Sequence, residues 1–309
     1  MDFSHYSVLL KESVDLLDVH KGGIYADGTM GGGGHSGEIL SRGAGRLIGI
    51  DRDAEAIAAA TERLRAYGDK LTAVHANFSE IRRILGGLGI DKLDGAVLDL
   101  GVSSYQLDNA GRGFSYMHDA PLDMRMDRDD PLTAYDVINT YSEDELCRIF
   151  FGYGEEKWSK RIARAIVEQR KKKEIISTGE LAETIKAAIP QRARRDGGHP
   201  AKRVFQAVRI EVNNELKMLE GAIRDFVDVL KPGGVLSVIT FHSLEDRIVK
   251  QTFAALAEGC ICPKSFPVCV CGNKPKVKLL TRKPVLPGSA EIAENSRSKS
   301  AKLRAALKQ

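Results

Sequence analysis

The sequence predicts an α/β protein built on an open, mostly parallel sheet, with an all-helical domain inserted into it. Three observations support this fold class. Residues 24–98 alternate apolar, β-branched runs with helix-favouring runs in a βαβαβ pattern. Four consecutive glycines, Gly31 to Gly34, follow the first predicted strand. From Ser142 the periodicity is wholly helical, until a near-continuously apolar strand, 235–241, resumes the sheet.

The composition is that of an ordinary globular protein. The 309 residues are 43% hydrophobic and 28% charged, which allows a sizeable core in one large domain or two modest ones. The N-terminal segment has no basic stretch before its apolar residues, and no apolar run approaches the roughly 20 residues of a membrane span. We therefore expect a cytoplasmic protein without a membrane partner. A net charge of +4 is too small to indicate nucleic-acid binding, so the placement of the basic residues has to decide it.

The glycine run is the first candidate ligand site. The predicted strand stops at Asp27, and a helix is expected from Gly37 to Ser41. Glycines at such a turn let the backbone approach a ligand closely, and the N-terminus of the helix offers unpaired N–H groups. A surface loop is the alternative interpretation of the same glycines.

The acids on either side of the loop indicate the ligand. Asp51 ends the second strand, where nucleotide-binding folds place an acid against ribose hydroxyls. A pyrophosphate loop would follow GxGxxG spacing, whereas here Asp27, Thr29, Gly31 and Gly33 stand at alternate positions. An acid before the loop suits a cationic amino-acid ligand, so the pattern favours S-adenosylmethionine over a nicotinamide dinucleotide.

Further candidates follow the other predicted strands. Phe78 comes after the third strand and either packs on an adenine ring or belongs to the core. Asp99 and Ser103 follow the fourth strand, and His242 follows the fifth. Because open α/β sheets bind ligands at the carboxyl ends of their strands, these three are the candidate catalytic residues. The alternative for the His242 segment is to cap the helix expected at 246–257.

The insertion carries two clusters of basic residues. A stretch without clear periodicity, 109–130, precedes it and is expected to form an ordered lid. Acids are sparse in both clusters, which favours a surface that follows phosphates over a solvated helix face. The first cluster comprises Lys157, Lys160, Arg161, Arg164, Arg170, Lys171, Lys172 and Lys173, and the second comprises Arg192, Arg194, Arg195, Lys202 and Arg203.

Four of the five cysteines stand in one short stretch, at Cys260, Cys262, Cys269 and Cys271. In a chain expected to be cytoplasmic, such a group favours a metal over disulfides, and one structural zinc is the candidate. Each arm is CxC rather than the CxxC of familiar zinc knuckles, so a role without metal stays open.

A series of motifs along nearly the whole chain resembles the ribosomal RNA small subunit methyltransferase H family. They are DGTMGGGGHSG, IDRD, LDLGVSSYQLD, RGFSY, PLDMRMD, HPAKRVFQAVRIEVN, FHSLEDRIVK and ENSRSKSAKLR. The resemblance implies a Rossmann-like S-adenosylmethionine-dependent methyltransferase fold. It also implies methyl transfer to the N4 amine of a cytidine in 16S rRNA. The implied cofactor contacts are Gly33, Gly34, His35, Asp51, Phe78, Asp99 and Gln106.

The resemblance also implies that a helical domain interrupts the methyltransferase domain. We place the methyltransferase domain at 1–108 and 214–309, and the lid loop with an RNA-binding helical insertion at 109–213. The basic C-terminal segment, 297–308, is expected to be partly disordered or to lie over the RNA side. The expected partner is 16S rRNA or the small ribosomal subunit, and a homodimer is a further candidate. A nicotinamide-dependent oxidoreductase and a non-catalytic ribosome assembly factor are the alternative functions.

Overall fold

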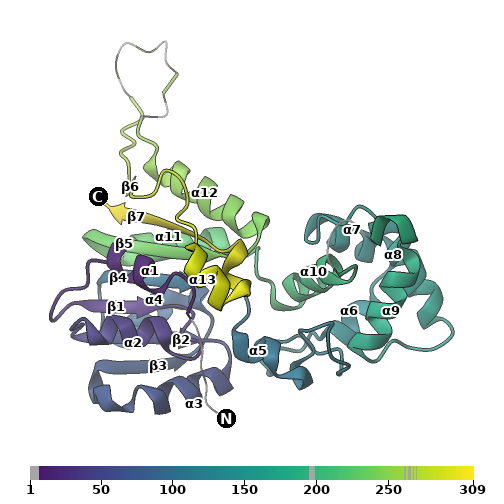
Figure 1. The fold of residues 1–309 in the computed structure, drawn as a ribbon. Coiled ribbons are helices and arrows are strands. Elements are labelled where there is room, and N and C mark those ends of the chain that lie inside the picture. The colour runs from purple at the N-terminus through teal and green to yellow at the C-terminus, as the bar shows by residue number, and fades with distance from the viewer. Residues whose placement is uncertain (1–6, 195–198, 261, 264–265, 267, 269) are drawn as a thin grey trace. The chain divides into compact units, whose positions relative to one another are not determined.

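The computed structural model describes residues 7–194, 199–260, 262–263, 266, 268 and 270–309 (Figure 1). The chain divides into two compact units. We call residues 1–101 with 216–309 the α/β unit, and residues 102–215 the helical unit. The sequence analysis placed the boundaries after 108 and before 214. In the structure they lie after 101 and before 216, and the turn and short helix that follow the fourth strand therefore belong to the helical unit.

The α/β unit is built on a seven-stranded sheet with the order β3-β2-β1-β4-β5-β7-β6. Strands β1 to β5 pair in parallel, and β7 and β6 add antiparallel pairs at one edge. The predicted Rossmann-like fold is confirmed, and the point where the strand order reverses lies between β1 and β4. The strands are β1 Ile24–Asp27, β2 Arg46–Asp51, β3 Leu71–His75, β4 Leu93–Asp99, β5 Leu230–Thr240, β6 Val277–Leu279 and β7 Lys302–Lys308.

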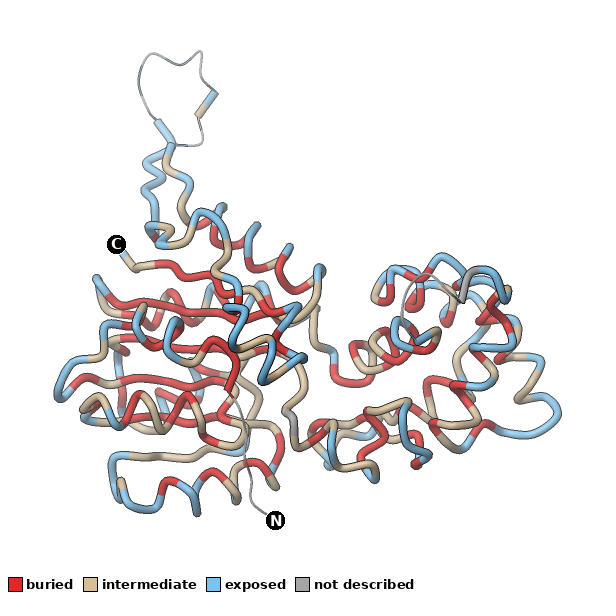
Figure 2. The backbone as a smooth tube through the Cα atoms, viewed as in Figure 1, coloured by how far each residue is buried: buried red, intermediate tan, exposed pale blue. Residues whose placement is uncertain are grey.

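Helices cover both faces of this sheet, because successive strand residues point to opposite sides. Tyr25 and Leu47 pack in one apolar cluster with α1, α2 and α3, whereas Ala26 and Ile48 pack in another with α4, α11 and α12. The strands are accordingly buried along most of their length (Figure 2). The helices are α1 Leu10–Leu16, α2 Gly34–Ser41, α3 Ala54–Arg63, α4 Ile81–Gly87, α11 Leu219–Val229, α12 Ser243–Ala257 and α13 Ser289–Glu294, with 3-10 turns η1 Arg65–Lys70, η2 Phe78–Glu80 and η5 Ser296–Ser300.

The helical unit packs around an apolar core of its own. Several of its helices begin at side-chain caps, as at Ser142, whose hydroxyl accepts from the N–H of Glu145 while the Glu145 carboxylate accepts from the N–H of Ser142. The elements are α5 Ser104–Asp108, η3 Ala110–Arg112, α6 Ala134–Thr140, α7 Glu143–Gly152, α8 Ser159–Arg170, α9 Thr178–Ala188, η4 Gln191–Arg194 and α10 Lys202–Asn213.

The stretch expected as a lid, 109–130, is ordered and packs into the core of the helical unit. Arg112 is buried, and its guanidinium donates to the carbonyl oxygens of Arg125 (3.0 Å) and Met126 (2.9 Å). The side chain of Asn213 donates to the carbonyl oxygen of Met124 (2.7 Å) and accepts from the N–H of Met126 (2.8 Å). These side chains supply the hydrogen bonds that an irregular backbone would otherwise lack.

The C-terminal segment differs from expectation, because residues 302–308 form strand β7 between β5 and β6. The basic composition hid a strand in which apolar and basic residues alternate. Leu303 and Ala305 are fully buried. Arg304 is buried as well, and its Nε donates to Oδ1 of Asp246 (2.7 Å). In the part of the chain that the structure describes, no helix is long and apolar enough to cross a membrane.

Candidate active site

The glycine-rich loop leaves β1 and lies across the ends of the two neighbouring strands. The N–H of Gly28 donates to the carbonyl oxygen of Val97 in β4 (2.9 Å), and the N–H of Met30 donates to that of Ile50 in β2 (2.9 Å). The loop therefore stands at the point where the strand order reverses, which is where open α/β sheets bind ligands.

The loop ends in a helix that begins earlier than the sequence indicated. Gly33 has a φ of 77°, a left-handed conformation that favours glycine, and α2 starts at Gly34 rather than at Gly37. A Cβ on Gly34 would collide with Oγ of Ser7. The glycine run hid this start because glycine is a poor helix former. His35 consequently lies in the first turn of α2, where it is buried.

Asp51 lies beside the loop at the end of β2. Its Oδ2 accepts from the N–H of Gly31 (2.7 Å), and its Oδ1 accepts from the N–H of Asp53 (2.9 Å). Burial raises the pKa of Asp51 above its ordinary value. The N–H of Arg52 donates to the same carboxylate. An ionised carboxylate has about four acceptor positions, so after these three bonds one remains for a ligand hydroxyl.

Asp27, at the end of β1, is fully buried beneath the loop. It accepts hydrogen bonds from Oγ of Ser36 (2.7 Å) and from the N–H of Thr29 (3.2 Å). Burial outweighs these bonds and raises the pKa of Asp27 to about 6. The sequence marked this residue only as the acid before the loop and did not count it among the site residues.

Asp99 ends β4 on the other side of the switch point. Its N–H donates to Oγ1 of Thr29 (2.6 Å), and its Oδ2 lies 3.8 Å from Nδ1 of His35. Its Oδ1 is buried and has no hydrogen-bond partner among the described residues. Burial, then the charges of Asp27 and Glu245, raise the pKa of Asp99 well above its ordinary value.

This end of the sheet therefore brings Asp99 together with the acids that raise its pKa, Asp27, Glu245 and Glu291, and Asp51 in turn raises the pKa of Asp27. Glu245 is almost wholly buried, and Glu291 accepts from the N–H of Leu9 (2.8 Å). Buried like charges destabilise one another, and a cation among them would offset that cost. The set suits a cationic ligand such as a sulfonium or an ammonium group and is unsuited to a pyrophosphate.

Phe78 begins η2 after β3 and is half-buried against the core. The Cβ of Phe78 lies 3.2 Å from the position that a Cβ on Gly28 would occupy, so Phe78 is next to the glycine loop. The structure thus brings Phe78, Asp51 and the loop to the same edge of the sheet.

His242 caps α12, which begins at Ser243, earlier than expected. Its Nδ1 accepts from the N–H of Glu245 (3.4 Å), and the Glu245 carboxylate accepts from the N–H groups of His242 (3.2 Å) and Phe241 (2.8 Å). Nε2 of His242 lies 3.1 Å from Oε1 of Glu245. Both ring nitrogens therefore face Glu245, and the capping role that the sequence held open is realised.

Ser103 and Gln106 belong to the helical unit. Ser103 is the N-cap of α5, and its Oγ accepts from the N–H of Gln106 (3.2 Å). Oε1 of Gln106 accepts from the N–H of Ser103 (3.0 Å) in return. This capping box sets the direction of the turn that follows β4.

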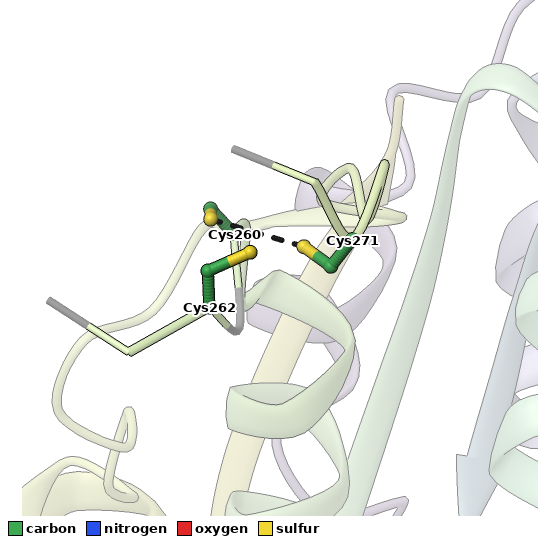
Figure 3. A group of neighbouring side chains, drawn as sticks. All are labelled: Cys260, Cys262 and Cys271. Carbon is green, nitrogen blue, oxygen red and sulfur yellow. Dashed lines mark hydrogen bonds between the residues drawn. The ribbon is translucent and has the colours of Figure 1, made fainter. Parts of the chain in front are cut away.

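Three of the four clustered cysteines lie in the described part of the α/β unit, where Cys260, Cys262 and Cys271 gather (Figure 3). Cys269 lies outside the described residues.

The first basic cluster is exposed on the helical unit except for Arg170, which is half-buried and donates to the carbonyl oxygens of Ile138 (2.6 Å) and Tyr141 (2.6 Å). Lys171 and Lys173 form ion pairs with Glu168 and Glu180, so acids are less sparse there than the sequence indicated. Among the described residues, no acid lies within ion-pair distance of Lys157, Lys160, Arg161 or Lys172. Of the second cluster, Arg195 and the side chain of Arg194 lie outside the described residues.

Two exposed aromatic residues flank the basic start of α8, and sequence reasoning missed them. Phe151, in the last turn of α7, is 71% exposed, and Trp158, the N-cap of α8, is 36% exposed. Aromatic residues interleaved with cations would have been the signal.

Comparison with known proteins points to one family. Residues 2–309 match the model of the MraW methylase family. The ribosomal RNA small subunit methyltransferase H 2 of Agathobacter rectalis is 58% identical over 307 residues, which cover 98% of each chain. The ribosomal RNA small subunit methyltransferase H of Carboxydothermus hydrogenoformans is 56% identical over 308 residues, which cover 100% of this chain and 99% of its own.

Among solved structures, an rRNA methylase from Streptococcus thermophilus aligns over 98% of this chain and 97% of its own. Its identity is 10% and its TM-score 0.45. The Rossmann-like fold of this chain follows from the strand order described above.

Proposed function

Because this chain belongs to the MraW methylase family, we propose that it transfers a methyl group from S-adenosylmethionine to the N4 amine of a cytidine in 16S rRNA. The names of the relatives, which cover the whole chain, support the small-subunit rRNA as the substrate. The observation that carries the chemistry is Asp99, a half-buried acid beside the glycine loop whose Oδ1 is buried and has no hydrogen-bond partner among the described residues.

The residues around the loop fit the cofactor group by group. Asp51 accepts from a ribose hydroxyl, and Phe78 packs on the adenine. Gly33, Gly34 and His35 let the backbone approach the ligand at the start of α2. When bound, S-adenosylmethionine supplies a methyl group on a positively charged sulfur, which the acids Asp27 and Asp99 stabilise electrostatically.

The exocyclic amine of cytosine is a poor nucleophile because its lone pair is delocalised into the ring. The protein therefore has to align the amine and accept its hydrogens. Asp99 is the proposed acceptor, since a raised pKa makes its carboxylate a better base. Ser103 is the second proposed contact to the amine, and Gln106 a further contact to the cofactor. For His242, whose ring already faces Glu245, we propose a role in steering the base.

The helical unit is the proposed rRNA-binding surface. Lys157, Lys160 and Arg161 would contact phosphates, and Phe151 and Trp158 would stack on unpaired bases. Cations and aromatic residues together commonly bind single-stranded nucleic acid. The target cytidine must be unpaired or flipped out of its stack to enter an active site. The proposed compartment is the cytoplasm. A zinc ion at the cysteines is proposed separately, because methyl transfer needs no metal.

A map of rRNA nucleosides by mass spectrometry, from cells with and without the gene, tests the function. We expect N4-methylcytidine in 16S rRNA to disappear on deletion and to return with the wild-type gene. A copy carrying Asp99→Asn should not restore the modification. A non-catalytic assembly factor would not need Asp99, so this variant separates an enzyme from such a factor. Unchanged N4-methylcytidine on deletion would refute the proposal.

The nicotinamide-dependent oxidoreductase is tested by calorimetry on the purified protein. S-adenosylmethionine is expected to bind, and NAD is not, because the acids beneath the loop would repel a pyrophosphate. Tight binding of NAD would favour the alternative.

A further inference from the structure

The thiols of Cys260, Cys262 and Cys271 form a compact group on the segment that joins α12 to β6 (Figure 3). Their sulfur atoms all lie within 4.8 Å of one another, and those of Cys260 and Cys271 are 3.8 Å apart. Thiolates bound about 2.3 Å from a zinc ion at tetrahedral angles lie about 3.8 Å from each other. The spacing of the pair therefore matches that of two ligands on one zinc ion.

Backbone N–H groups point at two of the sulfur atoms. The N–H of Val270 donates to Sγ of Cys262 (3.4 Å), and the N–H of Asn273 donates to Sγ of Cys271 (3.5 Å). The second bond is made by a turn at Gly272, whose φ of 63° favours glycine. Donors of this kind stabilise sulfur as the thiolate, which is the form that binds metal.

A side chain other than cysteine brings the two ends of the segment together. The amide of Asn273 donates to the carbonyl oxygens of Glu258 (3.1 Å) and Gly259 (2.6 Å). Because Asn273 stands two residues after Cys271 and Gly259 immediately precedes Cys260, this clamp holds the cysteines of both arms in register.

The described residues of this segment have little apolar burial. Phe266, Val268 and Val270 are 50%, 70% and 74% exposed. A segment whose apolar side chains face solvent gains little from the hydrophobic effect, and small segments of this kind are commonly held by a metal or by disulfides.

We propose that Cys260, Cys262 and Cys271 bind one structural zinc ion as thiolates. Each thiol releases its proton to solvent on binding, and no electron is transferred. Zinc is the class of metal that thiolates at tetrahedral spacing select. The site lies on the α/β unit, and its role is to hold the segment between α12 and β6 in one conformation.

Metal analysis and native mass spectrometry of the full-length protein, purified under reducing conditions without chelator, test the site. We expect about one zinc ion per chain. Cys271→Ser and Cys260→Ser should each lose most of the zinc. Cys147→Ser, a half-buried cysteine of α7 in the helical unit, is the matched control and should keep it.

Cobalt substitution gives a second readout that needs no variant to fold. After removal of zinc, the wild-type protein should take up Co²⁺ with thiolate-to-metal charge-transfer absorption, and adding zinc should displace it. A reduced protein that binds neither ion, a disulfide between Cys260 and Cys271 in an anaerobic preparation, or full zinc in Cys271→Ser would each overturn the proposal. None of these outcomes bears on methyl transfer.

Discussion

The two units place their charges in opposite ways. The α/β unit gathers acids at the end of its sheet, where burial and then the charge of Asp27 raise the pKa of Asp99, and burial and the charge of Asp51 raise the pKa of Asp27. The helical unit keeps its cations on the surface, as at Lys160 and Arg161, and satisfies its buried Arg112 with carbonyl oxygens. A fold optimised for stability alone would avoid the first arrangement.

A third acid shows that the α/β unit can bury a carboxylate at low cost. Asp246 is paired with Arg304 and Lys302, and these partners hold its pKa below the ordinary value despite its burial. Asp27 has only hydrogen-bond donors. Among the described residues, no lysine or arginine pairs with Asp27 or Asp99, so a bound cation would offset the cost of ionising these acids, which is the basis of the first three predictions.

The largest effect is expected for Asp99→Asn, which keeps the size of the side chain but removes its charge. A positioned proton acceptor contributes about 10²- to 10⁴-fold, so single-turnover methyl transfer at saturating cofactor and RNA should slow by that factor. Asp15→Asn, an exposed acid of α1, is the control and should leave the rate unchanged. A wild-type rate in Asp99→Asn would move the acceptor elsewhere, with Ser103→Ala as the next test.

Asp27→Asn should stabilise the protein in the absence of cofactor. The pKa of Asp27 rises from 3.8 to about 6 on folding, which corresponds to about 3 kcal/mol. Below pH of about 4 the carboxyl is neutral in both states, so variant and wild type should be equally stable. Wild-type stability is then lost as the pH rises through about 6, and the full difference should appear at pH 7 to 8.

Urea unfolding across this pH range measures the effect, and calorimetry should show weaker binding of S-adenosylmethionine to the same variant. A variant that is less stable than the wild type at pH 8 would mean that the bonds from Ser36 and Thr29 outweigh burial.

Asp51→Ala should weaken the binding of S-adenosylmethionine about ten- to a hundredfold, because charge-assisted hydrogen bonds contribute about 1.5 to 3 kcal/mol. Asp51 also holds the N–H of Gly31, so part of the loss would come from the loop itself. Asp51→Asn, which keeps one acceptor oxygen, separates the two and should fall between wild type and alanine. Equal affinities for all three by calorimetry would remove Asp51 from the cofactor site.

The sequence predicted the sheet better than the site. The five parallel strands follow from their apolar runs, and the glycine loop and Asp51 follow from their order along the chain. Strand β7 was missed because Lys302, Arg304 and Lys308 gave the segment a basic composition. The raised pKa of Asp27 was missed for a different reason: it comes from burial and from the charge of Asp51, which lies on the neighbouring strand β2 and meets Asp27 only in the folded sheet.

Stacking of the helical unit's aromatic residues on bases should not depend on salt, unlike the contacts of its cations with phosphates. Phe151→Ala should weaken binding of single-stranded rRNA segments by about 1 to 3 kcal/mol for each base that loses its stacking partner. The slope of log affinity against log salt should not change. Leu286→Ala, an exposed apolar residue of the α/β unit that is 60% exposed, should have no effect. A changed slope would mean that the substitution disturbs neighbouring cations instead.

The smallest effect is expected for single cations of the helical unit. If Lys160 contacts a phosphate of single-stranded RNA, Lys160→Ala should make the slope of log affinity against log salt shallower by about 0.7. Lys171→Ala should change it less, because Lys171 already pairs with Glu168 (2.8 Å) and its loss frees an acid as well as removing a cation. Lys70→Ala, an exposed cation of the α/β unit that like Lys160 has no ion pair among the described residues, is the matched control for net charge. Equal changes for Lys160 and Lys70 would show that RNA responds to the overall charge of the protein, and the helical unit would then lose its assigned role.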